Sequence, residues 1–336
     1  MNVAMWAKAL QVMPRVSKEE WAKLDIIARW LVATRSAALV LSFMAATIAG
    51  ILALRDGEFH FVPWLLVTIG LFMAHGANNF LNDLVDYVKG VDKDNYFRAQ
   101  YGPQPLVTGL MSMRELLTYA AVTGLIAAAC GAYLIATSQT PTGIFILMAI
   151  GAFFVLFYTF PLKYIGLGEL SVLLVWGPLM IGGGYYTITG QWDWNMVIAS
   201  FPFGLGVASA IFGKHVDKYA ADKEKHIYTL PVLIGERNAR YGAVVMMVLQ
   251  YVVVLYLIAT RYFSPAMLLV LLALPSLRLC WLMFSKPRPD GPPANMPPNV
   301  WPLWFVAASF DHSRRFGGFF VLGLIIDTAI HLMNWW

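Results

Sequence analysis

The chain has 336 residues, of which 59% are hydrophobic and only 13% charged, and its mean hydropathy is +0.63. A soluble domain carries roughly 25% charged residues, so this composition excludes an ordinary soluble protein. The formal net charge of +5 comes from Lys and Arg residues whose placement indicates membrane topology and an anionic substrate, not nucleic acid as a partner.

Residues 1–30 lack the apolar core and cleavage site of a signal peptide. Trp6, Trp21 and several basic residues recur there at helical spacing, which predicts an amphipathic helix on the cytoplasmic membrane surface. We therefore predict an amphipathic cytoplasmic segment over 1–30 and a single transmembrane domain over 31–336.

Nine apolar runs follow, each close to the roughly 20 residues that cross a bilayer as a helix. They cover 36–54, 62–82, 115–136, 143–161, 168–187, 195–213, 241–260, 264–284 and 317–335. The sequence thus predicts an all-α fold, a polytopic bundle of nine transmembrane helices.

The basic residues predict the orientation of this bundle. With a cytoplasmic N-terminus and alternating helices, 22 of the 24 Lys and Arg residues face the cytoplasm, and only Arg55 and Arg261 do not. The long polar loops, 83–114, 214–240 and 285–316, fall on the same side. We expect the active site at the cytoplasmic end of a multi-pass protein of the cell inner membrane, with no catalytic role for the proline-rich third loop.

Polar residues gather where the second predicted helix ends. At about 100° per residue, Asn79, Asn82 and Asp86 share one face of that helix, and Asp83 adjoins it. Such groups in an apolar membrane helix line a cavity or mark a functional site. A loop whose acids and bases merely pair with one another is the alternative, and it explains groups inside the helix less well.

Acids and bases are mixed just past this helix. Asp92 follows Asp86, and Lys89 and Arg98 stand among these acids. Mg²⁺ binds carboxylate and phosphate oxygens, and Lys or Arg side chains offset the remaining phosphate charge. This mixture predicts a magnesium–diphosphate site.

A second such stretch, residues 213–236, follows another apolar helix on the same predicted side. It holds Asp217 and Asp222 among lysines that include Lys218 and Lys225. By itself, a solvated helix face explains this stretch equally well. The repetition of the pattern favours one metal–diphosphate bound by both loops.

Asn82-Asp83-x-x-Asp86, with a second acidic loop that ends in Thr229-Leu230-Pro231, resembles the UbiA superfamily of intramembrane prenyltransferases. The resemblance spans nearly the whole chain. The stretches 82–92, 98–103 and 158–186 look most like the branch that prenylates 1,4-dihydroxy-2-naphthoate in menaquinone biosynthesis. It implies Mg²⁺-dependent transfer of a polyprenyl group from polyprenyl diphosphate to an aromatic acceptor in the bilayer.

The resemblance also implies roles for individual residues. The catalytic residues are Asp86, Asn82, Asp217 and Lys163. The metal ligands are Asp83, Asp86, Asp92, Asp217 and Asp222. The residues that bind the diphosphate or the acceptor are Arg35, Asn79, Lys89, Arg98, Tyr158, Lys218 and Lys225.

The chain departs from the family pattern at two places. Asp217 and Asp222 are five residues apart instead of four, which turns their side chains about 140° away from each other on a regular helix. We expect a one-residue π-bulge to compensate. Gln104-Pro105 also stands where the naphthoate branch has an Arg nearby, which bears on the acceptor and not on the reaction.

Three alternatives stay open at this point. The first, within the same superfamily, is a prenyltransferase whose acceptor is hydroxybenzoate or another lipid precursor, or a terpene cyclase. A second alternative, from another class, is a membrane transporter, although transporters tend to show internal repeats and helices broken at the midplane. The third is a structural membrane scaffold, which would not need Asn79, Asn82 and Asp83 at the inner end of a helix. The sequence leaves the oligomeric state undetermined.

Overall fold

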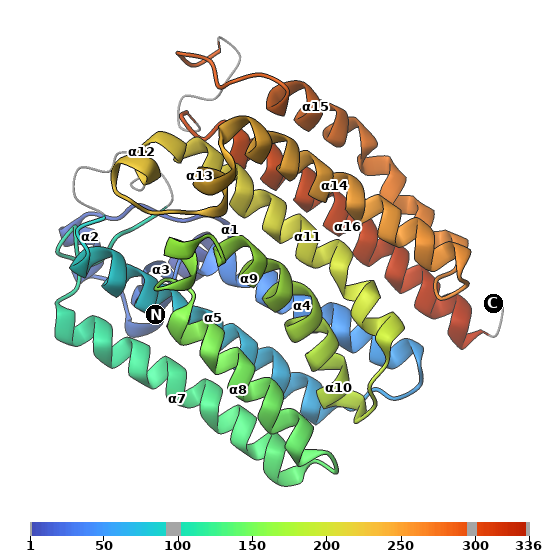
Figure 1. Cartoon of the computed structure of the whole chain (residues 1–336). Coiled ribbons are helices and arrows are strands. Elements are labelled where there is room, and N and C mark those ends of the chain that lie inside the picture. Colours follow the sequence, from blue (N-terminus) through green and yellow to red (C-terminus); the bar gives the residue numbers. More distant parts are fainter. Residues whose placement is uncertain (1, 92–101, 294–300, 334–336) are drawn as a thin grey trace. The chain divides into compact units, whose positions relative to one another are not determined.

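The computed structural model describes residues 2–91, 102–293 and 301–333, and within them every regular element is a helix (Figure 1). The predicted all-α class is therefore confirmed. The chain divides into two compact units: Met1–Ala46 with Leu65–Pro161, and Thr47–Trp64 with Leu162–Trp336. The prediction of one membrane domain over 31–336 stays a prediction.

The first unit begins with three short helices, α1 (Val3–Gln11), α2 (Lys18–Ala22) and α3 (Ile26–Ala33). It continues with the first part of α4 (Ser36–Arg55) and most of α5 (Phe61–Val88). Two further apolar helices, α7 (Met113–Thr137) and α8 (Pro141–Phe157), pack against each other and complete the unit.

The N-terminal helices belong to the core of this unit. Ser17 opens α2 with a capping box, and Asp25 opens α3 by accepting the Ala28 N–H at 2.9 Å. Trp21 of α2 is buried in one cluster with Phe80 of α5 and Leu116 of α7. The segment thus stabilises the helices that carry the first polar stretch, while its contact with a membrane surface stays a prediction.

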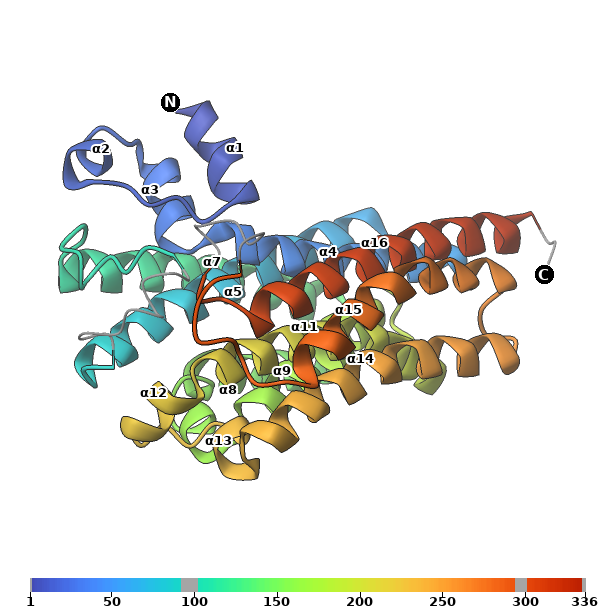
Figure 2. The same cartoon turned by 90° about the horizontal axis from the view of Figure 1, so that it is seen from above.

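The second unit is built around α11 (Trp194–Asp217), which packs against helices on several sides (Figures 1 and 2). Its helices before α11 are η1 (Leu162–Ile165), α9 (Gly168–Leu174), the π-helix η2 (Val175–Gly182) and α10 (Gly183–Thr189). Those after it are α12 (Tyr219–Glu224), α13 (Leu230–Ile234), α14 (Glu236–Ala259), η3 (Pro265–Ala273), α15 (Leu274–Phe284) and α16 (Phe305–Leu332).

Glycine lets α11 approach its neighbours closely. A Cβ on Gly204 would lie 2.9 Å from the Leu173 carbonyl oxygen and 3.0 Å from the Gly177 nitrogen. In a membrane the hydrophobic effect does not drive helices together, so packing at small residues takes its place. The backbone contact at Gly204 therefore fixes where α11 meets α9 and η2.

We expect Gly204→Ala to lower the free energy of unfolding by about 1–3 kcal/mol, because the added methyl group forces packed backbone apart. Thermal unfolding in detergent measures this loss. Gly318→Ala on α16 is the matched control: its Cβ would meet nothing within 4 Å, so it is expected to be neutral or slightly stabilising. Equal melting temperatures for the two variants would contradict the prediction.

Eight helices of the described residues are long and apolar enough to cross a membrane. A ninth apolar helix, α8, has 17 residues. Each predicted span coincides with a helix, but the count of nine spans and the cytoplasmic N-terminus stay predictions.

The last helix starts earlier than the sequence predicts. α16 begins at Phe305, inside the expected loop 285–316. Its extra turns carry polar residues that make hydrogen bonds inside the fold: the Ser309 hydroxyl donates to the Phe305 carbonyl at 2.8 Å, and His312 Nδ1 lies 2.9 Å from the Ser276 hydroxyl. These partners reduce the cost of burying polar groups in a helix.

Candidate functional site

The predicted carboxylates of the first unit lie near the C-terminal end of α5 and are buried. Asp83 is 2% exposed and Asp86 is 0% exposed, while Asn82 is half-buried. The helix continues to Val88, so the whole Asn82–Asp86 motif is helical, as its spacing predicts. A buried carboxylate needs a cation or hydrogen-bond donors to stay charged.

Arg35 supplies that charge to Asp83. It occupies the link between α3 and α4 with φ +55, and its Nη1 donates to Asp83 Oδ1 at 2.6 Å. Its Nη2 donates to the Asn79 carbonyl at 3.2 Å, and the Asn79 amide donates back to the Thr34 carbonyl at 2.8 Å. The structure thus joins three of the predicted residues, Arg35, Asn79 and Asp83.

Two segments of the first unit lie near these predicted residues. Lys89 is exposed, and its Nζ lies 3.8 Å from the centre of the Phe160 ring, two residues after Tyr158 at the C-cap of α8. A Cβ on Gly102, whose φ is +126, would lie 3.3 Å from Arg35 Cδ. The chain therefore returns to Arg35 after the first acidic loop. Asp92 and Arg98 lie outside the described residues.

In the second unit the expected π-bulge between Asp217 and Asp222 is wrong. The helix α11 ends at Asp217, Lys218 turns with φ −96 and ψ 5, and α12 starts at Tyr219. Among the described residues, π geometry occurs in η2, around Pro178. The helix therefore breaks between the two acids, at Lys218, where a bulged helix was expected to continue.

Asp217 caps a different helix. Its two carboxylate oxygens accept the backbone N–H groups of Phe305 and Val306, each at 3.0 Å. The N-cap residue of α16 is Trp304, which offers no side-chain acceptor, and the first N–H groups of a helix need one. The missing Ser, Thr, Asp or Asn before Phe305 is the sequence signal that an outside acceptor was required.

Lys218 and Asp222 form a buried ion pair. Lys218 Nζ lies 2.8 Å from Asp222 Oδ1, and the two residues are 5% and 1% exposed. Lys225 follows at the C-cap of α12. Lys163 is 7% exposed in η1, with its Nζ 5.5 Å from the Tyr164 ring.

A buried pair that the sequence pattern did not predict, His215 and Glu169, holds the second loop. His215 Nδ1 lies 2.5 Å from Glu169 Oε1, and Glu169 Oε2 accepts the Leu230 N–H at 3.3 Å. Both side chains are almost fully buried. Glu169 therefore ties the start of α9 to the end of α11 and to the start of α13, on either side of residues 218–229. An ionisable residue that opens an apolar helix was the available signal.

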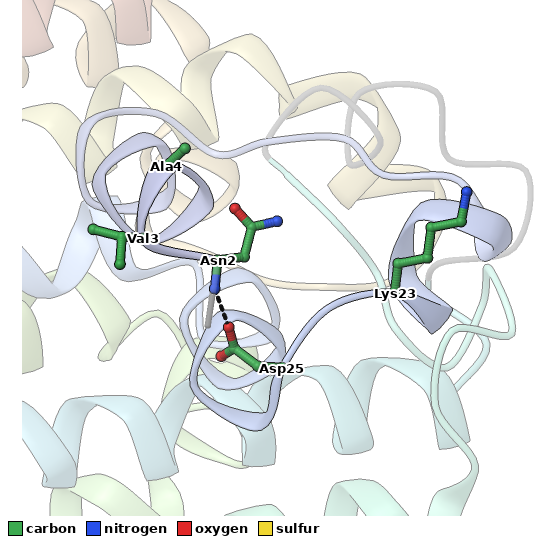
Figure 3. Close-up of a pocket in the computed structure, with 5 residues that line it drawn as sticks. All are labelled: Asn2, Val3, Ala4, Lys23 and Asp25. Carbon is green, nitrogen blue, oxygen red and sulfur yellow. Dashed lines mark hydrogen bonds between the residues drawn. The ribbon is translucent and has the colours of Figure 1, made fainter.

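A surface pocket of about 430 Å³ lies elsewhere, at the N-terminal helices, lined by Asn2, Val3, Ala4, Lys23 and Asp25 (Figure 3). The N–H groups of Ala28 and Asn2 donate to the Asp25 carboxylate and hold its pKa below the usual value. None of the predicted site residues lines this pocket, so we assign it no part in the chemistry.

Within the described ranges, no three His, Cys, Asp or Glu side chains come together as a metal site. Magnesium does not require such a cage, because it binds through one or two carboxylates, waters and substrate phosphates. The second loop can offer one such carboxylate oxygen, because Asp222 Oδ2 is buried and accepts no hydrogen bond from the described part of the chain.

Comparison with known proteins agrees with this chemistry. The model of the UbiA prenyltransferase family matches residues 43–305. A UbiA prenyltransferase domain-containing protein 1 homolog of Drosophila melanogaster is 26% identical over 73% of this chain and 68% of its own length. A 1,4-dihydroxy-2-naphthoate octaprenyltransferase of Escherichia coli (strain K12) is 29% identical over 65% of this chain and 72% of its own length.

Solved structures show the same fold. A UbiA homolog from Aeropyrum pernix K1 superposes with a TM-score of 0.64, over 87% of this chain and 98% of its own, at 18% identity. A UbiA homolog from Archaeoglobus fulgidus bound to GPP and Mg²⁺ gives a TM-score of 0.57, over 89% of this chain and 99% of its own, also at 18% identity. Identities this low bear on the fold alone.

Proposed function

The chain belongs to the UbiA prenyltransferase family and is a multi-pass membrane enzyme, and we propose that it transfers a polyprenyl group from polyprenyl diphosphate to 1,4-dihydroxy-2-naphthoate. The observation that carries the reaction is the buried carboxylate Asp86 near the end of an apolar helix. The Escherichia coli naphthoate octaprenyltransferase among the relatives supports the acceptor. The proposal places the enzyme in the inner membrane and in menaquinone biosynthesis.

Mg²⁺ is the proposed cofactor, and the structure of the Archaeoglobus fulgidus relative bound to GPP and Mg²⁺ supports it. The proposed ligands are the carboxylates of Asp83, Asp86, Asp92 and Asp222. Asp217, which the family resemblance also suggested, accepts the N–H groups of Phe305 and Val306 and caps α16 instead. When bound, Mg²⁺ offsets the negative charge that develops on the leaving diphosphate. Asp86 is 0% exposed near the end of an apolar helix, and it is the carboxylate of the described motif that we expect to matter most.

The remaining polar residues hold the diphosphate and stabilise its departure. Cationic side chains donate hydrogen bonds to the phosphate oxygens, whose negative charge grows as the bond breaks. The proposed donors are Arg35, Lys89, Arg98, Lys163, Lys218 and Lys225. Asn79, Asn82 and Tyr158 offer neutral hydrogen bonds. Asn79 also positions Arg35, because the Asn79 amide donates to the Thr34 carbonyl and Arg35 donates to the Asn79 carbonyl.

The bond changes follow from these roles. The bond between C1 of the prenyl chain and the diphosphate oxygen breaks, and its electron pair leaves with the diphosphate. The ring carbon of the acceptor then bonds to C1. With 1,4-dihydroxy-2-naphthoate, that carbon loses its carboxyl group as CO₂; with another aromatic acceptor, it loses a proton.

A transfer assay on purified protein in detergent tests the proposal. It contains Mg²⁺, geranylgeranyl diphosphate and either 1,4-dihydroxy-2-naphthoate or 4-hydroxybenzoate. We expect prenylated naphthoquinol that disappears when EDTA removes the metal. Product from hydroxybenzoate alone would keep the reaction and refute the acceptor. Diphosphate released without any acceptor would point to a cyclase, and none released from folded protein would refute prenyl transfer.

A further inference from the structure

The buried ion pair of Lys218 and Asp222 leaves one carboxylate oxygen of Asp222 without a hydrogen bond from the described residues. Both residues are at least 95% buried, and one oxygen of the carboxylate, Oδ1, contacts the ammonium group at 2.8 Å. The other, Oδ2, is buried and accepts no hydrogen bond from the described part of the chain. An ammonium group has three donors, of which the structure assigns one, to Asp222.

A half-satisfied buried pair is costly. Buried polar atoms almost always have a partner, and those that lack one need a physical reason. Taking two opposite charges out of water stabilises a fold only when further hydrogen bonds satisfy them. A ligand that brings both an anionic oxygen for Lys218 and a cation for Asp222 Oδ2 would complete this pair. A metal-bound diphosphate has both.

The neighbouring acid, Asp217, is not available for such a ligand. Its two oxygens accept the N–H groups of Phe305 and Val306. One turn earlier α11 packs closely on the start of α16, since a Cβ on Gly213 would lie 2.9 Å from the Phe305 carbonyl oxygen. With α11 held that tightly to α16, releasing Asp217 would leave the first turn of α16 without acceptors.

We propose that the ammonium group of Lys218 and the carboxylate of Asp222 together bind the diphosphate end of the substrate. Asp217 serves only as a helix cap. This inference rests on the proposed function. A loop with two inward carboxylates would present two negative charges to an anionic diphosphate and need divalent cations to offset both. The Lys218–Asp222 pair has no net charge. This loop therefore binds the diphosphate with one divalent cation fewer than a loop with two carboxylates would need.

The number of bound divalent cations tests the proposal directly. Mn²⁺ replaces Mg²⁺ as the probe, and electron paramagnetic resonance counts the ions bound per protein in the presence of geranyl S-thiolodiphosphate, an unreactive analogue. Lys218→Asp sets a second carboxylate four residues before Asp222. We expect it to raise the count by one ion relative to the unaltered protein.

The affinity for the analogue gives a second readout. We expect Lys218→Met to weaken analogue binding about tenfold or more, because it removes a charge-assisted hydrogen bond, and Lys218→Arg to retain most of the affinity. Lys218→Met also leaves Asp222 buried without its cation, and this change alone could unfold the protein. The double variant Lys218→Met/Asp222→Asn removes both charges and is expected to fold yet bind the analogue as weakly as the single variant.

Asp217→Asn is the matched control, one residue away on the same chain. We expect a lower melting temperature, because one cap of α16 is weakened, and an unchanged Mn²⁺ count. The proposal is overturned if Lys218→Asp binds no additional ion, if Asp217→Asn loses one, or if the folded double variant binds the analogue normally.

These outcomes separate the inference from the proposed function. Failure of the unaltered protein to bind the analogue overturns both. Binding of the analogue without transfer from geranylgeranyl diphosphate refutes the function, and the Mn²⁺ counts then still decide the role of Lys218. Normal transfer with Mn²⁺ counts that do not respond to Lys218 refutes only the inference.

Discussion

Asp86→Ala is expected to lower the kcat of prenyl transfer by about 10²–10³-fold, the usual cost of removing one group that stabilises charge in a transition state. Asp86 is 0% exposed in an otherwise apolar helix, and in the proposed function it binds the metal that offsets the charge of the leaving diphosphate. Release of diphosphate at saturating Mg²⁺ and geranylgeranyl diphosphate measures the effect.

Two further variants make this result decisive. Asp86→Asn keeps the shape of the side chain and removes its charge, so it should lose activity with little change in melting temperature. Asp311→Asn removes a partly exposed carboxylate whose Oδ2 lies 2.8 Å from Nε of the exposed Arg315 on α16. Its activity is expected to stay within about twofold, because ion pairs at the surface contribute little. A folded Asp86→Asn protein with near-normal kcat would exclude Asp86 from the chemistry.

The largest effect on stability is expected at a buried charge network of the second unit, far along the chain from the acidic loops. Arg55 lies 3.7 Å from Asp327 and 2.9 Å from Asp56, and its guanidinium stands 4.3 Å from the centre of the Tyr262 ring. Asp327 is 0% exposed and accepts the Ser264 N–H at 2.6 Å. The network joins the end of α4 to the start of η3 and to α16.

Arg55→Met is expected to lower the free energy of unfolding by about 3–5 kcal/mol, because it leaves the Asp327 carboxylate buried without its arginine. Thermal and denaturant unfolding in detergent measure this loss. Combining Arg55→Met with Asp327→Asn removes both charges and should restore part of the stability. Arg261→Met, which changes an exposed arginine, is the control and is expected to have little effect. A double variant no more stable than Arg55→Met would show that the charge pair is not the cause.

The sequence predicted this network only in part. Asp327 and His331 stand four residues apart on one helix, a spacing that lets their side chains meet, and His331 Nδ1 lies 3.7 Å from Asp327 Oδ2. Arg55 was notable in the sequence only as one of two basic residues predicted to face away from the cytoplasm. Its Nη1 also lies 3.7 Å from Asp327 Oδ2. Partners this far apart in the chain meet through folding, which no local pattern encodes.

The sequence by itself determined the all-α class, the positions of the apolar helices, the family and the polar face of α5. Each depends on a property read from neighbouring residues: hydrophobic length for a membrane helix, the 3.6-residue period for Asn79, Asn82 and Asp86, and motif spacing for the family. These properties do not change when distant segments pack together, so the sequence was enough.

Only the tertiary structure decided how the second loop uses its charges. By spacing alone, Asp217 and Asp222 looked like two equivalent acids that a bulge would align. Asp217 instead caps α16, 88 residues further along the chain, because that helix begins without an acceptor of its own. The helix break that follows leaves Asp222 paired with Lys218. The groups that a buried carboxylate contacts depend on which donors the fold brings close to it. Such donors can lie far away in the sequence.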